Sequence, residues 1–130
     1  MKKKMIQDLG NTIVYTFFKF QHELKLYHWQ TYSYSRHKAS DKLYEKIIDL
    51  IDTFIEIYMG KFGKRVQLSN RPLVIRSFSD QTIIRFLIQF QAFLVDLEIQ
   101  LPKGKNTDLL NIRDEMLGVV NQTLYLFTLQ

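Results

Sequence analysis

The chain contains no cysteine. Disulfide bonds and thiolate metal sites are therefore excluded, and a metal would have to be held by imidazole nitrogens and carboxylate oxygens. No uninterrupted apolar run approaches the roughly 18 residues that span a bilayer, and the lysines at the amino terminus are not followed by the apolar core of a signal peptide. The sequence therefore predicts a cytoplasmic or nucleoid-associated protein with no membrane partner.

Several signatures of enzyme chemistry are also missing. The sequence has no Gly-rich phosphate loop, no nucleophile elbow, no zinc-protease motif and no internal repeat. Its 130 residues are enough for one domain with a single core. The second half has no histidine and no Glu-x-x-His motif, so a di-iron centre inside one subunit is not expected. We interpret Asp96, Glu98, Asp114 and Glu115 as surface charges.

Apolar residues recur at helical spacing in four segments, which predicts an all-α fold. Pro72 lies in a connection from Gln67 to Ser77 that is long enough to cross from one end of a bundle to the other, so a ferritin-like order with a long crossover between the second and third helices is expected. The predicted helices run from about Ile6 to Thr31, from Arg36 to Phe62, from Ser77 or Ser79 to Leu101, and from Asn106 or Thr107 to the carboxyl terminus.

Three of these helices carry apolar residues on a second side, away from the core stripe. A monomeric helix would be polar there, so the pattern predicts contact with another subunit or a neighbouring helix. The residues are Val14, Phe18 and Trp29 in the first helix, Tyr44, Ile48, Ile55 and Met59 in the second, and Ile84, Ile88, Val95 and Ile99 in the third.

The second predicted helix carries two pairs of metal-binding residue types. His37 and Asp41 are four positions apart, as are Asp52 and Glu56, so each pair lies on one helix face one turn apart. The pairs are eleven positions from each other, which is about three full turns and roughly 16 Å along the helix. Because metal ligands lie within about 2.0–2.6 Å of their ion, each pair is only half of a site.

A second copy of this helix would complete both halves. If it packs antiparallel about a two-fold axis near residues 46–48, Asp52 and Glu56 of one subunit lie opposite His37 and Asp41 of the other. An isologous contact is self-complementary, so closing one site closes its twin. The spacing therefore predicts a homodimer with two metal sites in its interface. The alternative is a solvated helix face on which the acids pair with neighbouring lysines.

The pattern His28-Trp29, His37, Asp41, Asp52 and Glu56 resembles the ferroxidase motif of Dps-type mini-ferritins. The last four residues match that motif in type and spacing, although the segment between His28 and His37 is shorter than is usual and lacks the usual glycine. The resemblance implies that His28, His37 and Asp41 come from one subunit and Asp52 and Glu56 from its two-fold mate. Taken alone, His28 would more often be a hydrogen-bonded structural histidine.

The resemblance also implies an activity: Fe²⁺ would be oxidised by peroxide or oxygen and stored in a hollow homo-oligomer of twelve subunits. Zinc and manganese suit the same imidazole and carboxylate ligands as iron. An alternative is a ferritin-like structural or DNA-associated protein whose site is vestigial or binds zinc. A second alternative is a small helical interaction module whose acids lie only on the surface.

Lys2, Lys3 and Lys4 form a short basic run within a net charge of +5. Terminal lysines can neutralise DNA phosphates without sequence preference, and Dps-type proteins often bind DNA through such tails. The other interpretation is a solvated end, because three lysines release few counterions.

Overall fold

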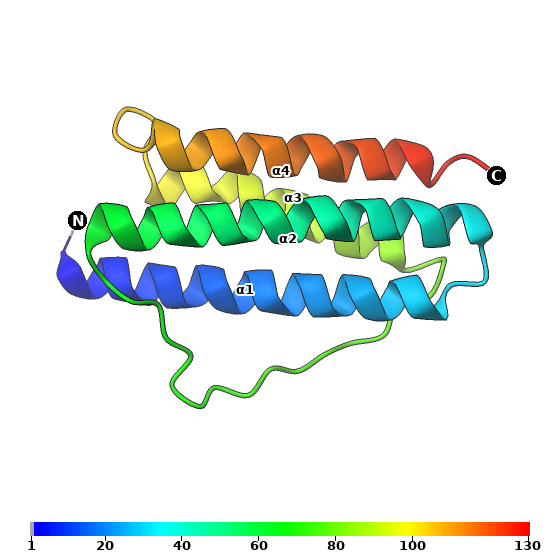
Figure 1. The fold of residues 1–130 in the computed structure, drawn as a ribbon, viewed down its shortest axis with the longest axis horizontal. Helices are drawn as coiled ribbons and strands as arrows, with labels where there is room; N and C mark the ends of the chain where they lie inside the picture. Colours follow the sequence, from blue (N-terminus) through cyan, green and yellow to red (C-terminus); the bar gives the residue numbers. More distant parts are fainter. Residues whose placement is uncertain (1) are drawn as a thin grey trace.

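The protein, described here from a computed structural model that covers residues 2–130, consists of four helices that lie side by side (Figure 1). Their bounds are α1 Lys3–Gln30, α2 Tyr34–Phe62, α3 Ile83–Gln100 and α4 Thr107–Leu126. No strand occurs among the described residues. The predicted all-α, four-helix architecture is confirmed.

The order of the helices in space is set by one long connection. α1 and α2 form an antiparallel hairpin, and residues 63–82 then run back along the bundle before α3 begins (Figure 1). α3 is consequently parallel to α2 and antiparallel to α4. α2 packs closely against both α1 and α4, whereas α1 and α3 approach each other less closely. The predicted crossover between the second and third helices is confirmed.

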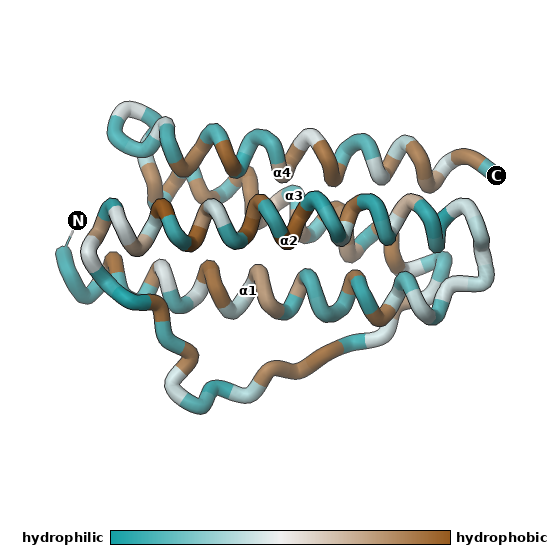
Figure 2. The backbone as a smooth tube through the Cα atoms, viewed as in Figure 1, coloured by the Kyte–Doolittle hydropathy of each residue, from teal (hydrophilic) through white to brown (hydrophobic). Residues whose placement is uncertain are grey.

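The core is formed by the inward stripes of all four helices, which appear brown on the inner turns of the bundle in Figure 2. Phe17 of α1 meets Phe54 of α2 edge to face, with ring centroids 5.4 Å apart. Phe20 stacks on Phe90 of α3 at 3.6 Å. Aromatic side chains thus fill the centre, where α1 and α3 leave more space than the other helix pairs.

Helix ends follow local chemistry in part. The Ser33 hydroxyl accepts a hydrogen bond from the Arg36 amide at 3.2 Å and caps α2. Gly63 ends α2 with φ 70°, which favours glycine, whereas Gly60 lies inside the helix. Asn106 does not cap α4 with its side chain, because its amide donates instead to the Pro102 carbonyl at 3.0 Å.

Several helix boundaries differ from the prediction, including the start of α2 at Tyr34 and the end of α4 at Leu126. α1 begins at Lys3 rather than Ile6, so Lys3 and Lys4 lie in its first turn and Lys2 precedes it. Met1, the first residue of the predicted Lys-rich tail, lies outside the described residues. α3 begins at Ile83, because Ser79 and Thr82 bond to each other and hold a turn before the helix.

The second apolar sides are partly exposed. Val14 is buried, so it contacts neighbouring segments of the same chain. Phe18 and Trp29 of α1 and Ile88, Val95 and Ile99 of α3 are exposed as large apolar side chains. The α2 residues of this set are half-buried. Within residues 2–130, no helix is both long enough and apolar enough to cross a membrane.

Candidate metal centre

The last turn of α1 and the first turn of α2 bring two histidines face to face. The rings of His28 and His37 stack with centroids 3.9 Å apart and an interplanar angle of 17°. His28 Nδ1 lies 2.8 Å from the carbonyl oxygen of His37, and His37 Nδ1 lies 2.8 Å from the carbonyl oxygen of His28. Each imidazole is therefore bound to the backbone of the other.

This reciprocal arrangement determines the tautomer of both rings. A carbonyl oxygen can only accept, so each Nδ1 must carry the proton and donate it. In the neutral form, each Nε2 then has a free lone pair, which is the usual state of a metal-ligating histidine whose other nitrogen is bonded to a carbonyl. The Ser40 hydroxyl donates to the same His37 carbonyl at 3.1 Å and lies 3.2 Å from His28 Nδ1.

The short turn between α1 and α2 is what places the two rings together. α1 ends at Gln30 and α2 begins at Tyr34, so His28 and His37 lie about one turn from the facing helix ends. His28 is 7% exposed, and His37 is half-buried. The turn that departs in length from the Dps-type pattern therefore still brings His28 to the position next to His37.

Asp41 is the third member of the group. Its Oδ1 lies 3.8 Å from His28 Nε2 and 4.0 Å from the amine of Lys25, and its side chain is 43% exposed. The same amine lies over the rings of Tyr44, at 4.6 Å, and Trp29, at 5.6 Å. Lys25 thus places one cation beside the carboxylate at the edge of the histidine pair.

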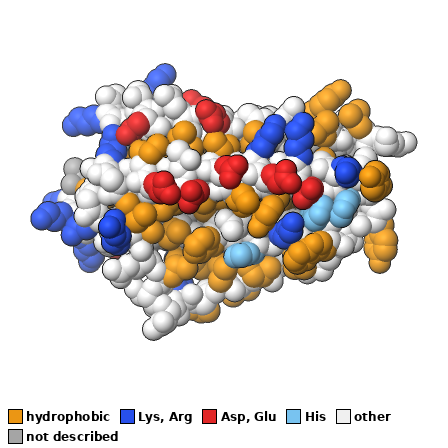
Figure 3. Space-filling model, viewed as in Figure 1, with side chains coloured by type: hydrophobic (Ala, Val, Ile, Leu, Met, Phe, Trp, Pro, Cys, Tyr) orange, Lys and Arg blue, Asp and Glu red, His pale blue; other side chains and the backbone are white. Residues whose placement is uncertain are grey.

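Asp52 and Glu56 lie apart from this group. Both are exposed on α2, along which the acidic side chains form a row that ends near the histidines (Figure 3). Across residues 2–130, no three histidine or acidic side chains come together in a way that could hold a metal ion. One chain therefore places His37 and Asp41 beside His28 without forming a three-residue metal site, and Asp52 and Glu56 lie elsewhere on α2.

Residues 28–127 match DUF5856, a family of unknown function. The chain belongs to this family. The matched region begins at His28 and includes all five candidate ligands. Part of the chain is also 47% identical, over 38 residues, to the uncharacterized 14.6 kDa protein in the mobD-ri intergenic region of Enterobacteria phage T4. That match covers 29% of this chain and 30% of the phage protein. No solved structure matches the chain.

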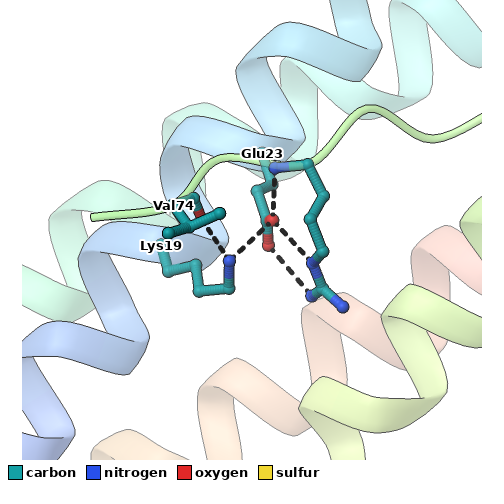
Figure 4. Close-up of polar contacts among 4 residues, drawn as sticks. Lys19, Glu23 and Val74 are labelled. Carbon is teal, nitrogen blue, oxygen red and sulfur yellow. Dashed lines mark hydrogen bonds and ion pairs between the residues drawn. The ribbon is translucent and has the colours of Figure 1, made fainter. Parts of the chain in front are cut away.

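Sequence reasoning missed a buried carboxylate in this DUF5856 protein. Glu23 of α1 is only 1% exposed and binds the crossover (Figure 4). Its carboxylate accepts from the amide, Nε and Nη2 of Arg76 at 2.8, 2.9 and 3.2 Å, and it lies 3.1 Å from the amine of Lys19. That amine also donates to the Val74 carbonyl. The hydrogen bonds that the Arg76 guanidinium donates to Glu23 raise its pKa.

Two further polar clusters hold the ends of the bundle. Asp80 accepts hydrogen bonds from Thr31 at 2.6 Å and Tyr27 at 2.7 Å, which lower the pKa of its carboxyl below the usual 3.8. At the other end, Arg113 is buried and binds Glu98 at 2.5 Å and Asp114 at 2.7 Å. Glu98 and Asp114 are exposed, as predicted, but each has a structural partner. Asp96 and Glu115 are exposed.

Proposed function

We propose that the chain is a ferritin-like subunit that binds Fe²⁺ between two-fold-related copies of α2 and oxidises it. The observation that carries this proposal is the His28–His37 pair, in which two imidazoles share one tautomer and each keeps a free Nε2. The pair stands beside Asp41, at the end of an acidic row on α2. Imidazole and carboxylate are ligands that iron accepts.

The topology supports the same proposal. Ferritin-like bundles differ from simple up-down bundles by one long crossover, which makes the second and third helices parallel. Residues 63–82 form such a crossover, and α2 and α3 are parallel (Figure 1). The order of helices therefore suits a ferritin-like subunit, although one fold supports many functions and the site residues decide the chemistry.

The donor set within one chain fits part of a metal site. Two ligands about 2.1 Å from one ion are about 3.0–3.4 Å apart when the angle between them is about 90–110°. His28 Nε2 and Asp41 Oδ1 are 3.8 Å apart, so a displacement of about half an ångström would bring them to that distance. On binding the metal, Asp41 would also lose its ion pair with Lys25. These two donors leave positions that His37 and a second subunit would fill.

An antiparallel partner copy of α2 supplies those donors. With the two-fold axis near residues 46–48, the partner's Asp52 and Glu56 lie opposite His37 and Asp41. Each site would then hold three carboxylates and two imidazoles, and such a cluster is electrostatically unfavourable without a cation. A bound metal therefore stabilises the dimer, and the dimer completes the metal site.

The chemistry follows from the ligands. The imidazoles bind Fe²⁺, and the carboxylates favour the higher charge of Fe³⁺. Each Fe²⁺ gives one electron to the oxidant, peroxide or oxygen, which is a co-substrate. Storage of the oxidised iron would require a closed shell, for which the Dps-type resemblance implies twelve subunits. Zinc or manganese would occupy the same ligands without this oxidation.

The test is Fe²⁺ oxidation by the purified protein, followed by absorbance, together with its mass in solution. We expect Asp52→Ala/Glu56→Ala to lower the rate at least tenfold and to weaken iron-dependent dimerisation. The matched control is Asp8→Ala/Glu115→Ala, which removes one exposed Asp and one exposed Glu from other helices and should leave both unchanged. Equal rates in the two double variants, or a protein that stays monomeric with iron, would overturn the proposal.

A second candidate is a ferritin-like structural or DNA-associated protein without ferroxidase activity. It is favoured by Lys25, whose amine already gives Asp41 a cationic neighbour, and by the exposed side chains of Lys2, Lys3 and Lys4. Zinc binding without Fe²⁺ oxidation would support it. Gel-shift titration on random-sequence DNA, at two salt concentrations, should show weaker binding when the three lysines are changed to alanine.

A further inference from the structure

The outer face of α3 carries an apolar stripe, which we define as Ile84, Ile88, Val95 and Ile99. Ile88, Val95 and Ile99 are 49%, 55% and 76% exposed. They follow one another at intervals of four and seven positions, so they line one side of the helix. Leu87 and Leu94, on the inner side, are fully buried. α3 therefore has one face packed in the core and a second apolar face in contact with solvent.

The stripe has the same spacing when it is read in either direction. Intervals of four, seven and four residues separate Ile84, Ile88, Val95 and Ile99. If a second α3 packs antiparallel, Ile84 lies opposite the partner's Ile99, and Ile88 lies opposite the partner's Val95. The centre of this register falls between Gln91, which is half-buried, and Ala92, which is exposed. A small side chain there lets the two helix backbones approach closely.

The charges on α3 point to the same partner. Arg85 and Asp96 are eleven positions apart, about three full turns, so both lie along one edge of the stripe. Both are exposed, and neither forms an ion pair or side-chain hydrogen bond with any residue in the range 2–130. In the antiparallel register, Arg85 lies roughly 3 Å along the helix axis from the level of the partner's Asp96. Its long side chain can span that offset, and the symmetry repeats the pair.

We propose that the α3 stripe is an interface with a second copy of this chain, in which two α3 helices pack antiparallel about a two-fold axis near Ala92. The occupant is identified by self-complementarity: an apolar pattern that matches its own reverse, flanked by opposite charges that meet only when the partner helix is another α3. An isologous contact has this property by symmetry. An interface with a different protein would not require the stripe to be self-complementary.

This inference does not depend on the proposed metal site. α2 and α3 lie on opposite corners of the bundle, so the two contacts use different surfaces (Figure 1). In a tetrahedral shell of twelve subunits, each subunit lies beside a single two-fold axis. Only one of the two interfaces, α2–α2 or α3–α3, can therefore lie on a two-fold axis of such a shell. A subunit that uses both would instead join α2 dimers through α3 into another assembly.

The first test exchanges the charges. Mass and concentration dependence are measured by analytical ultracentrifugation without added metal. We expect Arg85→Glu and Asp96→Arg each to weaken dimerisation by roughly tenfold, because like charges then face each other. The double variant Arg85→Glu/Asp96→Arg should return to within about threefold of the original protein. Only a partner that carries the same change can produce this recovery, so its absence would overturn the proposal.

The second test uses the absence of cysteine from the chain. Ala92→Cys places a thiol beside the two-fold axis, so mild oxidation should join most of the protein into covalent dimers. The matched control is Gln100→Cys, an exposed position on the same helix but off the stripe, which should form no covalent dimer. Equal crosslinking of the two variants, or none in either, would refute the α3 interface. If the Ala92→Cys protein forms the disulfide but does not bind iron, the α3 interface is supported and the proposed metal site is not.

Discussion

Replacing Arg76 tests whether the crossover is held to α1 by the buried carboxylate of Glu23. Arg76 donates from Nε and Nη2 at 2.9 and 3.2 Å to a carboxylate that is 1% exposed. Arg76→Ala removes both bonds and leaves Glu23 with only the Arg76 backbone amide and the Lys19 amine. A buried carboxylate that has lost one of two cationic partners should destabilise the fold (Figure 4).

The size of this destabilisation follows from how deeply Glu23 and Arg76 are each buried. Breaking a fully buried ion pair costs about 3–5 kcal/mol. The Arg76 side chain is 48% exposed, so water screens part of the attraction, and Lys19 remains in place. We therefore expect Arg76→Ala to lower the free energy of unfolding by about 2 kcal/mol, between an exposed pair and a buried one. Arg76→Lys keeps the charge without the two-pronged geometry and should cost about 1 kcal/mol.

Urea unfolding followed by circular dichroism measures this difference. The matched control is Arg71→Ala in the same crossover, where the guanidinium lies 3.6 Å from the ring centroid of Tyr15. Loss of that contact should cost only about 0.5–1 kcal/mol. Trypsin should also cut the crossover faster in the Arg76→Ala variant. If Arg76→Ala destabilises no more than Arg71→Ala, the buried carboxylate does not depend on its arginine and the reasoning fails.

Three further substitutions test other parts of the bundle. Asp80→Asn should make the free energy of unfolding less dependent on pH under acidic conditions. Hydrogen bonds, first that of Thr31, lower the pKa of Asp80 below 3.8. The carboxylate therefore stabilises the fold above that pH, and this stabilisation is lost as the pH falls through the folded-state pKa. Urea titrations between pH 3 and 7 measure it, and parallel curves for both proteins would contradict it. Gly10→Ala should destabilise by about 1 kcal/mol despite better helix propensity, because the new Cβ would lie 2.7 Å from the buried ring of Tyr58; an unchanged melting temperature would show that the ring moves freely. Arg113→Ala should cost about 1–2 kcal/mol in calorimetry, because it removes the buried bond to the Leu94 carbonyl and two ion pairs whose carboxylates are half exposed; a cost below about 0.5 kcal/mol would refute this.

The amino-acid pattern was sufficient to predict the helices and much of the core. Periodicity placed α2 and the inward stripes of all four helices, because residues three and four apart must share a helix face whatever surrounds them. α2 begins after Ser33, whose side chain caps the helix, and ends at Gly63, which adopts the left-handed conformation. The weaker points were α1, which starts at Lys3, and α3, which starts at Ile83. The start of α1 has no side-chain cap to mark it, and the start of α3 depends on a turn held by side-chain hydrogen bonds between Ser79 and Thr82.

The sequence alone determined which residue types are present at metal-ligand spacing and that the ligands on one helix lie too far apart to share an ion. Only the tertiary structure decided that His28 meets His37, that both rings have the same tautomer, and that Glu23 is buried beneath the crossover. The physical reason is that spacing along a helix is fixed by local backbone geometry. Contacts between α1, α2 and the crossover depend on how separate segments pack, and short-range patterns do not encode that.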